Sequence, residues 1–220
     1  MFPGVTTAAI ALLCLAAAPA PAVTVRPPNE VEFTAIVHRA RFERSLLGLG
    51  MPGYHAVVWK GGSAAGAGLF EADVSDTDVL DALERLRRPG PAIPIDAWEK
   101  RRDAKSRAPD TVIAGPAVDV LVRLPGRGSL APLSELLVDP GGRGLDLRFG
   151  NNRANIAKWG SGCIVCLYSC PGSKVGNARY TLRDYENGVT SFRVRDGVLP
   201  ADGTRVGIVL RLKPQGSPPG

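Results

Sequence analysis

Three cysteines stand close together in the second half of the chain, and they are the side chains best suited to chemistry. Cys163, Cys166 and Cys170 follow the spacing C-x2-C-x3-C-P, and the fourth cysteine, Cys14, lies in an apolar leader. The bacterial iron–sulfur run C-x2-C-x2-C-x3-C-P shares the last three of these cysteine positions, but Gly160 stands where its first cysteine would be. The spacing therefore predicts a thiol site and leaves its occupant open.

Three kinds of occupant or chemistry fit these thiols. A zinc or copper ion would take the three thiolates and one imidazole, for which His38 and His55 are the candidates. An iron–sulfur cluster fits less well, because it ordinarily needs four ligands and because the predicted leader lacks a twin arginine. Cys163 and Cys166 also have the C-x-x-C spacing of a redox pair, although no βαβ pattern surrounds them.

Backbone geometry decides whether the thiols can meet. On a straight strand Cys163 and Cys166 would point to opposite faces, whereas positions i, i+3 and i+7 of a helix share one face. The residues Ile164-Val165 favour a strand and 169–172 favour a turn, so the third cysteine can fold back toward the others. The alternative is that all three cysteines are small hydrophobic residues buried in a central strand.

Composition and the amino-terminal stretch indicate the class of protein. The 220 residues are 45% hydrophobic, enough for a sizeable core, and the net charge of +6 suits an anionic partner. Dense Lys/Arg blocks are absent, so no nucleic-acid partner is expected. An uncharged apolar stretch with an alanine-rich end predicts a signal peptide over residues 1–22. We therefore expect an exported protein, periplasmic or extracellular, with no transmembrane span in its mature chain.

Alternating apolar residues predict an α+β fold, predominantly antiparallel β with two or three short helices. Strands are expected over residues 30–38, 54–60, 68–74, 117–124 and 145–149. An amphipathic helix should begin at Ser75 or Asp76 and end before Pro89-Gly90. Shorter helices are expected over residues 94–102 and 133–137.

The C-terminal part predicts a three-stranded antiparallel meander. Apolar residues alternate around Tyr180 and Phe192, Asn187-Gly188 is typical of a hairpin turn, and residues 205–212 alternate again. One face would carry Arg179, Arg183, Arg193, Arg195, Arg205 and Arg211. Such a face would attract an anionic envelope component, such as lipid headgroups or acidic cell-wall polymer, unless the arginine stems simply cover the sheet.

The domain organisation is predicted to be simple. Residues 139–144 combine proline with three glycines and are the best candidate for an internal boundary, but the segment is too short for a true linker. A single domain is therefore expected over residues 23–213, followed by a disordered proline- and glycine-rich tail at 214–220.

Several segments resemble the YdjY-like domain family of exported bacterial proteins, some of which are described as ferredoxin-like. The segments are His55–Gly61, Val74–Leu83, Trp98 with Arg101, and above all Gly162–Asn177. The resemblance covers roughly residues 30–212 and implies export and a shared fold without supplying an activity. The missing fourth cysteine departs from the ferredoxin-like pattern.

These observations predict an extracytoplasmic, non-enzymatic binding protein whose cysteine cluster holds a metal or a thiol site. The sequence lacks a recognisable catalytic arrangement: Ser161, for example, stands outside any G-x-S-x-G motif. Two alternatives remain open, an electron-transfer or thiol-redox protein and a structural envelope module with buried cysteines.

Overall fold

The structure is a computed structural model that describes residues 22–44, 53–100, 103 and 110–214. The predicted signal peptide, apart from residue 22, and the predicted tail beyond residue 214 lie outside these residues.

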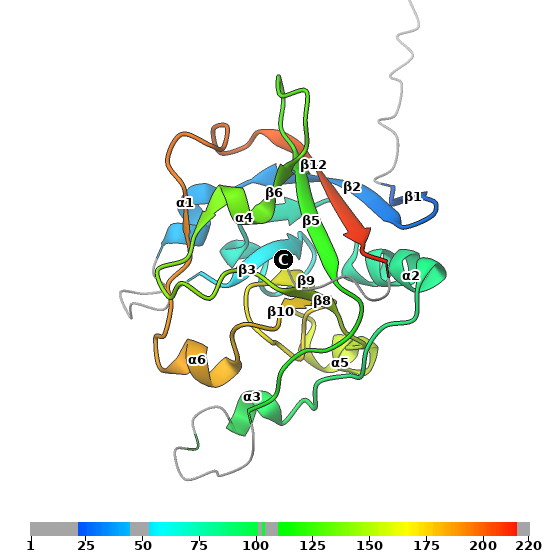
Figure 1. The fold of residues 1–220 in the computed structure, drawn as a ribbon, viewed down its shortest axis with the longest axis vertical. Helices are drawn as coiled ribbons and strands as arrows, with labels where there is room; N and C mark the ends of the chain where they lie inside the picture. The colour runs from blue at the N-terminus through cyan, green and yellow to red at the C-terminus, as the bar shows by residue number, and fades with distance from the viewer. Residues whose placement is uncertain (1–21, 45–52, 101–102, 104–109, 215–220) are drawn as a thin grey trace, which may run out of the picture.

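Most of the strands form one ten-stranded sheet (Figure 1). Its strands are β1 (Thr24–Arg26), β2 (Glu30–Val37), β3 (His55–Trp59), β4 (Phe70–Ala72), β5 (Val118–Arg123), β6 (Ala131–Pro132), β8 (Leu147–Phe149), β9 (Cys163–Cys166), β10 (Val175–Asn177) and β12 (Arg205–Leu212). The order is β6-β5-β12-β2-β4-β3-β9-β10-β8, and β1 also pairs with β2. A separate two-stranded ribbon joins β7 (Leu137–Val138) to β11 (Arg193–Val194).

The predicted fold class is wrong because the sheet is mixed. β3 runs parallel to β4, and β9 runs parallel to β10. The chain returns between β3 and β4 through a short 3-10 helix, η2 (Ala65–Ala67), and between β9 and β10 through the loop that carries Cys170. Local alternation predicts that a segment is a strand, but it contains no information on the direction of its neighbour.

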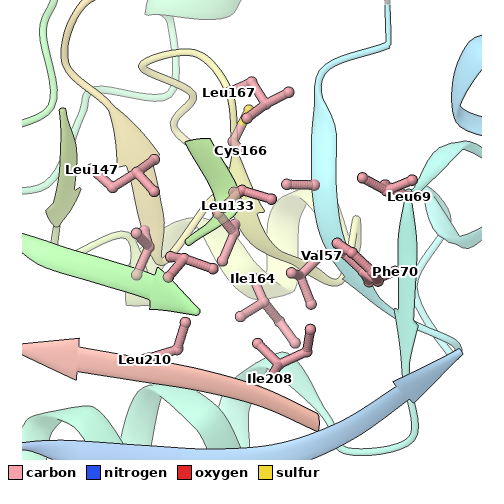
Figure 2. Packing of buried hydrophobic residues seen from close by; sticks show 14 of the residues in the cluster. Val57, Leu69, Phe70, Leu133, Leu147, Ile164, Cys166, Leu167, Ile208 and Leu210 are labelled. Atoms are coloured by element: carbon pink, nitrogen blue, oxygen red, sulfur yellow. The ribbon is translucent and has the colours of Figure 1, made fainter. Parts of the chain in front are cut away.

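The sheet curls into a half-barrel because its terminal strand β8 returns toward β5. Ala117, beside β5, forms an isolated antiparallel bridge with Arg148, and the Phe149 amide donates to the Pro116 carbonyl at 2.9 Å. The concave side encloses the core. Figure 2 shows Ile208 of β12 close to Ile164 of β9 and Val57 of β3, so strands from distant parts of the sheet share one apolar interior.

Six α-helices flank the sheet in the described part of the chain. They are α1 (Arg39–Glu43), α2 (Asp76–Leu86), α3 (Ala97–Lys100), α4 (Leu133–Leu136), α5 (Arg153–Trp159) and α6 (Leu182–Glu186). The predicted start of α2 is confirmed, since the Ser75 hydroxyl accepts a hydrogen bond from the Asp78 amide at 3.0 Å. None of the described helices is long and apolar enough to span a bilayer.

The predicted C-terminal meander is wrong. The segment around Tyr180 continues into helix α6, where Thr181 and Asp184 form a reciprocal capping box. Gly188, with φ +62°, follows the end of that helix instead of turning a hairpin. The strand at 205–212 is confirmed as β12, but it lies between β2 and β5 in the large sheet, whereas β11 belongs to the separate ribbon with β7.

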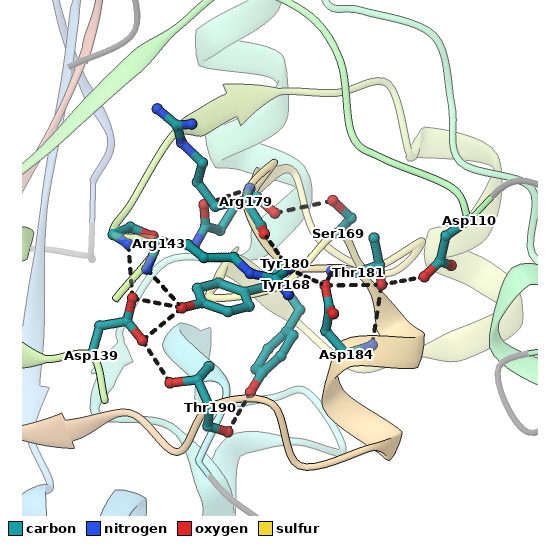
Figure 3. A network of polar contacts seen from close by, with 12 residues as sticks. Asp110, Asp139, Arg143, Tyr168, Ser169, Arg179, Tyr180, Thr181, Asp184 and Thr190 are labelled. Carbon is teal, nitrogen blue, oxygen red and sulfur yellow. Dashed lines mark hydrogen bonds and ion pairs between the residues drawn. The ribbon is translucent and has the colours of Figure 1, made fainter. Parts of the chain in front are cut away.

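The loop over residues 139–144 is fastened by the carboxylate of Asp139 (Figure 3). This carboxylate accepts hydrogen bonds from the Tyr180 hydroxyl at 2.7 Å, the Thr190 hydroxyl at 2.6 Å and the Gly144 amide at 2.7 Å. Burial acts to raise the pKa of Asp139, but these bonds and one from Gly141 outweigh it and hold the pKa below its ordinary value.

Asp139→Asn is therefore expected to destabilise the fold by about 1–3 kcal/mol, because the new amide group turns a donor toward groups that are themselves donors. The free energy of unfolding by urea measures the effect. Asp196→Asn is the matched control, because the Asp196 side chain is 95% exposed and, among the described residues, pairs only with Arg39. Loss of this surface ion pair should change the free energy of unfolding by less than about 1 kcal/mol. Equal effects of the two substitutions would contradict the structural role of Asp139.

Candidate metal centre

Pairing of β3 with β9 brings His55 to Cys163 and Cys166. The register between the two strands shifts twice, so that His55 lies opposite Cys166 and Val58 opposite Cys163. Such irregularities break the strict alternation of a straight strand, which explains how two cysteines three positions apart serve one site. The His55 Nδ1 atom lies 3.2 Å from Cys163 Sγ. One ligand atom from each of the three residues lies within 4.8 Å of the other two.

Cys170 joins the edge of this cluster. The Cys170 thiol is near enough to help raise the pKa of Cys166, but its sulfur is not among the three ligand atoms that lie within 4.8 Å of one another. Cys170 Sγ accepts the Gly172 amide at 3.5 Å. The turn after β9 thus brings the third cysteine beside this group without adding it to the three convergent ligand atoms. All three are free thiols in this structure.

Two asparagines that the sequence analysis missed hold the loop that carries Cys170. The Asn152 side-chain amide donates to the carbonyls of Cys170 at 3.1 Å and Ser173 at 2.5 Å. Asn155 donates to the Pro171 carbonyl at 2.8 Å. Both lie at the start of α5, and their N-x-x-N spacing on one helical turn is the only sequence signal that favoured such a role.

The cluster lies in the core of the domain. Residues 162–177 form an unbroken run of buried positions, so the segment that most specifically resembles the family is an interior one. Cys163 and Cys166 are fully buried, and His55 is 6% exposed. Gly162 permits this close packing: its φ is +70°, and a Cβ there would lie 2.7 Å from Gly62 Cα.

A buried ion pair lies beside the thiols. Lys174 Nζ is 2.5 Å from the Asp76 carboxylate and donates to the Gly172 carbonyl at 3.0 Å, with both charged side chains almost fully enclosed. The hydrogen bond from Cys166 lowers the pKa of Cys163 to about 5 against the effect of burial, with help from His55 and Lys174. Burial and the bonds to Cys163 and Cys170 raise the pKa of Cys166. The two pKa values are therefore shifted in opposite directions, and Cys163 is the more acidic thiol of the pair.

Aromatic rings cover the histidine side of the cluster. The Tyr54 ring centroid lies 3.9 Å from that of His55 and 4.8 Å from that of Tyr185. Burial, followed by the neighbouring Cys170, raises the pKa of the Tyr54 hydroxyl well above its ordinary value. These rings separate the cluster from bulk water and keep its local dielectric constant low.

The remaining predicted site residues lie elsewhere. His38, the other candidate fourth ligand, has its Nε2 atom 3.9 Å from Glu71 and lies outside the His55 group. The six arginines do not share a sheet face: Arg179 precedes α6, Arg183 lies in α6, Arg193 in β11, Arg195 just after it, and Arg205 and Arg211 in β12. Four of them contact acids or backbone carbonyls: Arg183 pairs with Asp110, Arg205 with Asp73, Arg211 with Glu30, and Arg195 donates to Glu135 O.

A curled mixed sheet with one histidine and three cysteines at its centre defines a β-rich domain with a buried thiol centre. The chain belongs to the YdjY domain family, whose domain matches residues 27–211, and this confirms the resemblance seen in the sequence. The chain is 31% identical over 160 residues to the protein named "Uncharacterized protein YdjY" of Escherichia coli strain K12, an alignment that covers 72% of this chain and 67% of that protein. No solved structure matches the chain.

Proposed function

We propose that this chain is a non-enzymatic binding protein whose buried cluster holds a soft metal ion. The observation that carries the proposal is the convergence of His55 Nδ1, Cys163 Sγ and Cys166 Sγ within 4.8 Å of one another. These residues come from two strands, so their grouping is a property of the fold and not of local spacing alone. Cys170 supplies the fourth ligand from the adjoining loop.

The donor set suits zinc or copper(I). Zinc binds cysteine sulfur at about 2.3 Å and histidine nitrogen at about 2.0 Å, which corresponds to tetrahedral edges of about 3.5 Å. The 3.2 Å between His55 Nδ1 and Cys163 Sγ is close to such an edge. Copper(I) favours the same soft ligands in trigonal form. The Lys174 ammonium group beside the thiols would offset part of the negative charge of a multi-thiolate site.

A second candidate function is thiol redox chemistry, favoured by the Cys163 and Cys166 sulfurs, which lie within 4.8 Å of one another. Exchange with an external disulfide would join these two sulfurs, while their two electrons and two protons reduce that disulfide to two thiols, and would leave Cys170 as the odd thiol. The full burial of both sulfurs counts against rapid exchange with a partner thiol.

Export and an anionic envelope partner are further parts of the proposal. Export rests on the apolar leader and its alanine-rich end. The anionic partner rests on the net charge of +6 and on Arg179 and Arg193, exposed side chains for which the described residues supply no ion-pair partner.

Metal analysis of the mature protein, purified without air and paired with a thiol count before and after denaturation, tests the proposal. About one zinc or copper per chain, with cysteines that become reactive only after the metal is removed, is the expected result. One disulfide and one free thiol would instead support redox chemistry. Three free thiols that bind neither metal on titration would overturn both and favour a structural module with buried cysteines.

A further inference from the structure

Basic side chains line a cavity that is separate from the cysteine cluster. It has a volume of about 520 Å³ and lies where the end of α2, the start of β5, β8 and the end of β12 meet. Every charged residue in its lining is a cation: Arg87, Arg88, Arg148 and Lys213. Figure 1 shows the end of β12 descending beside α2, and the Arg87 guanidinium donates to the Lys213 carbonyl at 2.8 Å.

The walls of this basic cavity are rigid backbone. The Gly90 amide donates to the Phe149 carbonyl at 2.9 Å, and the Lys213 amide donates to the Ala117 carbonyl at 2.9 Å. Gly115 has φ +136°, and a Cβ there would lie 2.1 Å from the Phe149 carbonyl oxygen, so only glycine fits this crossing. These backbone contacts hold together the chain segments that carry the cations.

The charge of the cavity is only half compensated. Arg148 forms a two-point contact with Asp146 at 2.7 and 2.9 Å, and Lys213 pairs with Asp119 at 3.1 Å. Within the described residues, the Arg87 guanidinium bonds only to a backbone carbonyl, and Arg88 has no hydrogen-bond or ion-pair partner. The partial negative charge at the end of α2, about half an elementary charge, offsets a minor part of these two guanidinium charges.

We infer that this basic cavity binds the phosphate group of a phosphate ester through Arg87 and Arg88. Two uncompensated guanidinium groups match the double negative charge of a phosphate monoester, and their planar donor forks suit its oxygens better than a lysine would. A volume of about 520 Å³ exceeds what a lone phosphate needs and leaves room for the esterified group, within the usual range of small-molecule sites. This inference is independent of the metal proposal.

Calorimetric titration of the mature full-length protein with glycerol phosphate, at low ionic strength, tests the site. Arg87→Gln/Arg88→Gln is expected to weaken binding by about tenfold or more. The control is Arg44→Gln/Arg127→Gln, which removes two arginine charges from exposed positions outside the cavity and outside the arginines proposed for the anionic partner, and should change the Kd less than about twofold. Arg88→Gln alone keeps the Arg87 contact to Lys213, so it separates loss of binding from loss of folding.

A second experiment, with vesicles that contain phosphatidic acid, distinguishes a lipid headgroup from a soluble phosphate ester as the occupant of the cavity. Vesicle binding that is lost in the Arg87/Arg88 variant and is displaced by glycerol phosphate would support a lipid headgroup as the occupant. Binding of glycerol phosphate without vesicle binding would support a soluble ester. Equal weakening in both double variants, equal affinity for acetate, or no binding of glycerol phosphate by the wild-type protein would overturn the inference.

Discussion

Cys163→Ser is expected to weaken zinc or copper(I) binding by at least about 100-fold, a larger loss than the 10- to 100-fold typical of a change outside the ligand set. Cys163 is one of the three convergent ligands: its sulfur lies 3.2 Å from His55 Nδ1 and within 4.8 Å of the Cys166 sulfur. A serine hydroxyl stays protonated at neutral pH, so the substitution removes an anionic soft donor and leaves a neutral hard one. Competition against a chromophoric chelator measures the affinity.

The two histidines provide a matched control pair. His55→Ala should lose metal binding to a similar extent, whereas His38→Ala should leave it unchanged because His38 lies beside Glu71 instead. Val165→Thr places a hydroxyl in the same buried strand without removing a ligand, and it controls for a general disturbance of the core. Undiminished metal binding in Cys163→Ser, or equal losses in both histidine variants, would rule out the proposed centre.

The sequence could predict the thiol segment but not its histidine. Cysteine spacing and the turn after β9 are local features, so the sequence could predict that the chain folds back after Cys166. The choice between His38 and His55 depends on which strand pairs with β9, a contact across 108 residues of chain. Periodicity reports which face of a strand is apolar and contains no information on such pairing or on its register.

The C-terminal error has a related cause. Tyr180 and Leu182 alternate with polar residues as a strand would, yet Thr181 and Asp184 have the T-x-x-D spacing of a helix cap, and the cap decided the local structure. Glycine with positive φ is required both after a helix and in a tight hairpin, so Asn187-Gly188 fitted either reading. The arginine face depended on this meander and has no counterpart in the structure.

Lys174 is the feature that sequence reasoning had least chance of finding. A lysine is ordinarily read as a surface residue, and its partner Asp76 lies 98 residues away at the start of α2. Its burial becomes visible only in the structure, where it lies within the continuous buried run 162–177. The pair fastens α2 to the loop between Cys170 and β10.

Lys174→Met is expected to destabilise the domain by about 3–5 kcal/mol, since it leaves the Asp76 carboxylate buried without its counter-charge. Methionine keeps most of the volume and the flexible stem, so the change isolates the ammonium group and its bonds to Asp76 and the Gly172 carbonyl. A loss of this size is a large fraction of the 5–15 kcal/mol by which domains are usually stable. Urea unfolding of the metal-free protein measures it without interference from metal binding.

A double variant and a surface control decide whether the charge is the cause. Lys174→Met/Asp76→Leu removes both charges and is expected to regain most of the lost stability, because a buried ion pair is often replaceable by apolar residues at little net cost. Lys60→Met breaks the surface ion pair between Lys60 and Asp73. Because the Lys60 side chain is 52% exposed, the change should lower the free energy of unfolding by less than about 1 kcal/mol. If the double variant proves as unstable as Lys174→Met, an unpaired carboxylate is not the source of the destabilisation, and the loss belongs to the bond with Gly172 or to packing.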